Sequence, residues 1–84
     1  MEYPKVEVLW HDANTESGWV TLEDAKEVLP QLCRSLGYLL VKDEVVVVIV
    51  QSIQEGNDDV GDALCIPRES VLEINYETFN EQTS

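Results

Sequence analysis

The longest uninterrupted apolar run of the chain lies near its centre, at residues 45–50, where five valines and one isoleucine follow one another. Such β-branched side chains restrict χ1 and fit a pleated surface, and a run without polar alternation is typical of a strand buried on both faces. We therefore expect residues 45–50 to form the central strand of a small β domain, continuing as far as Ile53.

Period-two alternation predicts the first and the last strand. In residues 5–11, Val6, Val8 and Trp10 share one face while polar side chains occupy the other. This is the pattern of a half-buried strand. Residues 71–76 alternate in the same way and form the expected fifth strand.

The apolar stretch at residues 35–41 predicts the second strand. Within it, Gly37 either permits a bulge or lets another backbone approach closely. Residues 42–44 are charged and form a short hairpin turn into the valine run. The second and third strands are therefore expected to pair antiparallel.

The chain after the valine run predicts a loop, a fourth strand and a single helical turn. Residues 54–62 are polar and contain two glycines, which is typical of an exposed loop. Residues 63–66 are apolar and make a short fourth strand. Residues 67–70 begin with a proline, which lacks the N–H that a ladder needs, and have the length of one helical turn.

Between the first two strands the pattern becomes helical. Residues 12–18 are rich in turn formers and predict a loop. Thr21, followed by acidic residues, has the arrangement of a helix cap, and Pro30 stops the element. The expected helix has two turns at most, and its apolar face consists of Leu22, Ala25, Val28 and Leu29.

Five short strands with a single turn before the last resemble the small SH3-like and Sm-like barrels. The resemblance is carried by residues 39–53, 66–70 and 71–76. It implies a mainly β fold: a small five-stranded SH3-like or Sm-like barrel, closed by a strongly bent sheet, with one short helix between strands 1 and 2. The glycine and asparagine RNA-contact loops of Sm proteins are not recognisable in the chain.

A second resemblance covers nearly the whole chain. Residues 9–13, 18–19, 35–39 and 66–68 look like segments of a group of short uncharacterised proteins carried by bacteriophages and their bacterial hosts. This resemblance implies a phage or bacterial origin and no established activity.

Length and charge limit the organisation and the partners. We expect one domain over residues 1–84, with a frayed polar tail at residues 77–84, since a chain of 84 residues holds one small core. Seventeen acidic residues against five basic ones give a net charge of -12, which repels phosphate and disfavours nucleic acid and anionic membranes. With no long apolar segment or leader pattern, a soluble cytoplasmic protein is expected.

Candidate catalytic and metal-binding groups are few. Cys33 and Cys65 are too few for a zinc site and are expected to be buried, reduced thiols. His11 and Asp12 are neighbours on a strand, so their side chains point to opposite faces and do not orient one another. The acidic residues of the loop at 54–62 do not have EF-hand spacing. We expect no enzymatic activity, no metal and no cofactor.

The aromatic residues give the remaining indication of function. Core packing is expected for Trp10 and Trp19, the latter under the lid of the barrel. In the alternative, Trp19 lines a shallow peptide-binding groove with Tyr38 and Pro67, and nearby carboxylates recruit a basic segment. Arg68 either pairs with an acid or is the single cation of a ligand site.

These patterns favour a non-enzymatic accessory module that binds another protein, with a basic surface as the candidate feature of that partner. The module is expected to be a monomer or a homodimer. Two alternatives stay open. The first is an acidic inhibitor that imitates nucleic acid and occupies a basic host protein. The second is a small-ligand sequestering protein with Trp10, Trp19 and Arg68 in its pocket.

Overall fold

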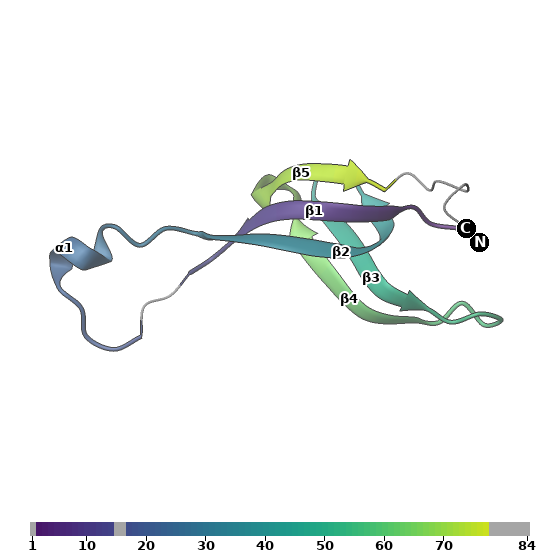
Figure 1. Ribbon diagram of the computed structural model, residues 1–84, viewed down its shortest axis with the longest axis horizontal. Coiled ribbons are helices and arrows are strands. Elements are labelled where there is room, and N and C mark those ends of the chain that lie inside the picture. The colour runs from purple at the N-terminus through teal and green to yellow at the C-terminus, as the bar shows by residue number, and fades with distance from the viewer. Residues whose placement is uncertain (1, 15–16, 78–84) are drawn as a thin grey trace.

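Five strands form a single antiparallel sheet in the computed structural model, which describes residues 2–14 and 17–77 (Figure 1). The spatial order of the strands is β4-β3-β2-β1-β5. A short helix, α1, lies between β1 and β2, and one 3₁₀ turn, η1, lies between β4 and β5. The elements are β1 (Lys5–Asp12), α1 (Leu22–Ala25), β2 (Gln31–Lys42), β3 (Val46–Ile53), β4 (Val60–Pro67), η1 (Arg68–Ser70) and β5 (Val71–Tyr76).

The predicted mainly β fold, its five strands, and the helix between strands 1 and 2 are confirmed. Closure into a barrel is not confirmed. In the part of the chain that the structure describes, β4 and β5 are the two edges of the sheet and do not pair with each other.

The hydrophobic core fills the concave side of the sheet. It contains the predicted inward face of β1 and the centre of β3, with contributions from β2 and β4. Val50 is also fully buried, on the face of β3 opposite to Val47 and Ile49, so the valine run is covered on both sides as predicted. Val45 is the exception, since it lies in the turn and is 72% exposed. The core cluster consists of Val6, Val8, Leu39, Val47, Ile49 and Ile66.

The hairpin between β2 and β3 is fixed by a carboxylate. Asp43 Oδ1 accepts hydrogen bonds from the backbone N–H groups of Val45 and Val46, both at 2.8 Å. These two bonds lower the pKa of Asp43, the bond from Val46 contributing most. The charged turn predicted at residues 42–44 is therefore confirmed, and its acid has a structural role.

Gly37 marks a close approach of two backbones. A Cβ atom at this position would lie 2.7 Å from the carbonyl oxygen of Val50 on β3. No side chain fits there without displacing backbone atoms. Of the two explanations for this glycine, close approach is therefore the one that applies, and the irregularity in the β2–β3 register lies further along, between Leu39 and Val41.

Two strands are longer than predicted. β2 begins at Gln31 instead of residue 35, because its ladder with β1 continues to the pair Asp12↔Gln31. β4 begins at Val60 instead of residue 63, because it pairs with Ile53 at the end of β3. Of the predicted tail, only Glu77 lies within the described residues, and its N–H donates to the Lys5 carbonyl at 2.9 Å; residues 78–84 lie outside them.

The sheet extends into a projection at one end. β5 pairs with β1 only as far as Trp10, and β3 pairs with β2 only from Tyr38 onward, so beyond Trp10 the β1–β2 ladder has no third strand. Figure 1 shows this ribbon leading to α1, away from the other strands. We call residues 11–14 and 17–32 the arm, and the other described residues the body.

The overall dimensions reflect the arm. The molecule measures 53 × 29 × 25 Å, and its radius of gyration is 16.8 Å. A compact domain of this length has a radius of gyration of about 12 Å. The chain therefore does not fold its arm back onto the body.

Candidate binding surface

The arm is exposed along its whole length. Among its described residues only Val28 is even half-buried. Trp19 is 103% exposed, which means that no other side chain covers its indole ring. Four aliphatic residues of the arm are exposed as well: Val20, Leu22, Leu29 and Leu32. The expected packing of Trp19 under a lid of the barrel is wrong.

Local signals explain why α1 forms at the end of the arm. The Thr21 hydroxyl oxygen accepts from the Asp24 N–H at 3.1 Å, as the sequence predicts. The helix is a single turn, and none of its residues is buried. The predicted stop at Pro30 is wrong, because the helix already ends at Ala25 with Lys26 as its C-cap. Val28 and Leu29 of the predicted apolar face therefore lie beyond the helix.

A shallow hollow of about 510 Å³ lies on the arm beside α1. Apolar and acidic side chains share its lining. Asp24 lies on α1, and Glu27 lies in the turn after it, where its N–H donates to the Asp24 carbonyl at 3.1 Å. The other lining residues are Asn14, Val20, Val28, Leu29, Pro30 and Gln31. The hollow thus has apolar side chains beside two carboxylates, which we call its rim.

Trp10 differs from Trp19 in its surroundings. It lies at the base of the arm, packs against the core, and its Nε1 donates a hydrogen bond to Ser35 Oγ at 3.0 Å. Core packing is confirmed for this residue. Trp10 is half-buried, and its ring and its indole N–H both have contacts within the body.

The other predicted groove residues lie away from Trp19. Tyr38 is half-buried on β2, opposite Lys5 and Val50, and Pro67 ends β4 opposite Val46. Since Trp19 is covered by nothing, the structure does not bring these three residues together. The groove predicted from Trp19, Tyr38 and Pro67 is therefore not formed.

Arg68 anchors the turn before β5. Its N–H donates to the Val45 carbonyl at 2.8 Å, and its side chain is half-buried. It borders an open hollow of about 640 Å³ together with Lys42, Asp43, Glu44 and Val45, so neither tryptophan contributes to this site. The small-ligand pocket expected from Trp10, Trp19 and Arg68 is not assembled.

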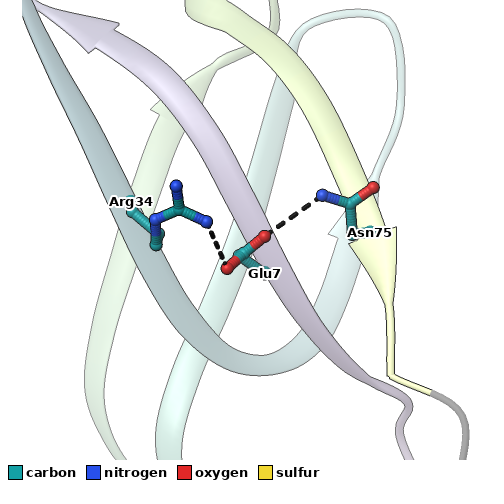
Figure 2. A network of polar contacts seen from close by, with 3 residues as sticks. All are labelled: Glu7, Arg34 and Asn75. Carbon is teal, nitrogen blue, oxygen red and sulfur yellow. Dashed lines mark hydrogen bonds and ion pairs between the residues drawn. The ribbon is translucent and has the colours of Figure 1, made fainter.

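A polar network joins three strands on the outer face of the body (Figure 2). Glu7 on β1 accepts from Arg34 on β2 at 2.7 Å and from Asn75 on β5 at 3.1 Å. The hydrogen bond from Arg34 is the main cause that lowers the pKa of Glu7, and the bond from Asn75 adds to it. Every charged group in this network has a partner, so its role is to hold the strands in register.

The candidate nucleophiles and bases do not form a constellation. His11 is exposed at the end of β1, and Asp12 Oδ1 accepts from the Ala13 N–H at 2.8 Å. Cys33 is half-buried, whereas Cys65 is exposed on the edge strand, so the expected burial of Cys65 is wrong. In the described part of the chain, no three of the metal-ligating side chains His, Cys, Asp and Glu gather.

The sequence predicts that Leu22 and Leu29 share an apolar face, but it does not show that both are left uncovered. One signal was present in the sequence. A helix confined between Thr21 and Pro30 is too short to be stable without packing, and acidic residues surround its apolar positions.

Comparison of the chain with models of protein families, with curated proteins and with solved structures finds no match. Within the described residues, no helix has the length and apolar character required to cross a membrane. Conclusions about function therefore depend on the geometry of the arm and the body.

Proposed function

We propose that the protein is a non-enzymatic, protein-binding accessory module of phage or bacterial origin that acts in the cytoplasm and binds its partner through the arm. The observation that carries the proposal is Trp19, fully exposed at the end of a projection that contains further uncovered apolar side chains. Large apolar side chains left uncovered in one short segment support an interaction site there.

The physical chemistry of tryptophan supports an anchoring role. Burial of roughly 200 Å² of aromatic surface contributes on the order of 5 kcal/mol before the costs of association. Tryptophan is also among the residues that dominate the energy of protein interfaces. In this proposal Trp19 enters a cleft of the partner, and Leu22 contacts the surface around that cleft.

The body supplies a rigid base for the arm. Its strand order, the pairing of β5 with β1 and the single 3₁₀ turn between β4 and β5 support an SH3-like small barrel as its architecture. Short strands joined by tight turns hold the ends of β1 and β2 in place. The arm is thereby presented at a fixed distance from the acidic surface of the body.

Capture of a partner from host lysate tests the proposal. Wild-type protein should retain a reproducible set of proteins, and Trp19→Ala should lose them while keeping its circular dichroism spectrum and melting temperature. Leu72→Ala is the matched control, because Leu72 is 55% exposed on β5, outside the arm. Retention of the same proteins by Trp19→Ala would contradict the proposal.

A further inference from the structure

We infer that the hollow on the arm selects a cationic, amphipathic segment of the partner, with a lysine or arginine side chain seated across Leu29 and Pro30. The inference deepens the proposed function and rests on it. Two independent properties of the arm support it, the composition of the hollow and the distribution of charge.

The composition of the hollow matches the two parts of a basic side chain. Lysine and arginine have a long apolar stem and a charged head, and they pack the stem on apolar surface while the head reaches a polar group. Val28, Leu29 and Pro30 supply the surface for the stem, and Asp24 and Glu27 supply carboxylates for the head. A neutral apolar segment would leave both carboxylates without a partner.

The charge of the arm points to the same class of partner. Its sequence carries one basic residue, Lys26, among several acidic ones: Asp12, Glu23, Asp24 and Glu27. The negative electrostatic field of the arm raises the association rate of a partner with a basic surface and favours binding at this site. An acidic partner is repelled.

A second copy of the chain does not supply the required cations. Each copy has a net charge of -12 and only five basic residues. Of these, Arg34 is paired with Glu7, and Lys42 donates to the Tyr76 hydroxyl at 3.3 Å with its ammonium 5.6 Å from the ring centre. With so few cations on an acidic surface, a second copy fits the hollow less well than a basic partner does.

The decisive comparison uses two double variants with equal charge. Asp24→Asn with Glu27→Gln neutralises the rim of the hollow. Glu55→Gln with Asp58→Asn neutralises two exposed carboxylates in the loop between β3 and β4, and asparagine suits the positive φ of 62° at residue 58. Both variants keep the size of each side chain, and both should fold like the wild type.

The probe is a synthetic leucine–lysine peptide that forms an amphipathic helix. A leucine–glutamate peptide of the same pattern and a lysine–serine peptide without an apolar face are its controls. We expect only the leucine–lysine peptide to bind, with amide shifts in ¹H–¹⁵N spectra confined to residues 20–31. At about 50 mM salt the rim variant should bind it at least about fivefold more weakly, and the loop variant less than about twofold.

The remaining outcomes overturn the inference. The inference is wrong if the leucine–lysine peptide does not bind or if the leucine–glutamate peptide binds equally well. It is also wrong if the two double variants lose equal affinity for the leucine–lysine peptide. A dimer of the wild type in light scattering that is lost in the rim variant would identify a second copy as the occupant instead.

The two proposals fail in different ways. If Trp19→Ala loses the captured proteins while the rim variant keeps them at both low and high salt, the proposed function stands and the inference is wrong. If Trp19→Ala keeps them, the proposed function is wrong whatever the peptides do.

Discussion

The body and the arm are made from similar proportions of apolar residues, yet they use them in opposite ways. In the body, alternation along β1 and the valine run on β3 place side chains against one another, and Val8, Val47 and Ile66 are completely buried. In the arm, Leu22 on α1 and Leu29 after it are 70% and 72% exposed.

The difference shows that an amphipathic pattern specifies which residues share a face and does not specify what covers that face. In the body the cover is another strand of the same chain. In the arm nothing in the described chain provides it, so these residues contribute little to folding and remain available for binding. The residues that stabilise the fold and the apolar residues left uncovered thus lie in separate regions.

The largest expected effect separates these two roles directly. Ile66→Ala removes a fully buried side chain and should lower the free energy of unfolding by about 2–5 kcal/mol, most of what a small domain has. Leu22→Ala on the arm should change it by less than about 0.5 kcal/mol. Urea denaturation of both variants measures the free energy of unfolding. Equal decreases in the two variants would mean that the arm is part of the core.

Gly37→Ala should produce the next largest effect. The added Cβ meets the Val50 carbonyl oxygen at 2.7 Å, so the backbone of β2 or β3 must shift, at a cost of roughly 1–3 kcal/mol. Gly61→Ala is the matched control, because its nearest neighbour, the Ser52 Cβ, lies 3.8 Å away. If thermal melts show that Gly61→Ala is less stable than Gly37→Ala, the close approach of the β2 and β3 backbones at Gly37 is contradicted.

A smaller effect is expected at the base of the arm. Ser35→Ala removes the acceptor of the Trp10 indole N–H, a loss of about 1 kcal/mol for a half-buried donor. Ser52→Ala, on the exposed side of β3, should have little effect. Chemical denaturation should show this order, and the Trp10 indole resonance should move only in the Ser35 variant.

The smallest expected effect is on the melting temperature at low pH. The pKa of Asp43 is lowered in the folded state by backbone hydrogen bonds, so its contribution to stability is complete above the ordinary aspartate value of 3.8 and is lost as pH falls through the lowered value. Asp43→Asn keeps an acceptor oxygen and cannot titrate. Melting temperatures between about pH 2.5 and 6 should therefore fall less steeply in this variant than in the wild type.

Glu23→Gln on the arm controls for the loss of one carboxylate from the net charge. If the melting temperature of Asp43→Asn falls with pH as steeply as that of the wild type, the Asp43 carboxylate does not stabilise the body. The titration thus compares a carboxylate that the fold uses with one that the arm presents to solvent.

The sequence predicted the body better than the arm for a physical reason. β1 and β3 have strong local patterns, and their burial follows because each pattern finds a complementary neighbour. In β5 the strand forms, but its burial does not alternate as predicted, since Leu72 and Tyr76 are exposed. The early start of β2 and the network of Glu7, Arg34 and Asn75 depend on strand register, which no local pattern contains.

For the arm, the local prediction was correct and the tertiary one was wrong. The Thr21 cap formed as expected, because it depends only on neighbouring residues, although the helix ends at Ala25 and not at Pro30. Whether Trp19 would be covered depends on segments far away in sequence. The hollow beside α1 depends likewise on how the chain returns from α1 to β2, so it was not predictable.

The small size of the core has a consequence for the life of the protein in a cell. About a quarter of the chain lies in the arm and adds nothing to folding, so the free protein has only a narrow margin over its unfolded form. A partner that binds the native chain and not the unfolded chain increases the free energy of unfolding, and the increase grows with the concentration of the partner. Copies without a partner should be degraded first, and cellular levels of the two proteins should rise and fall together.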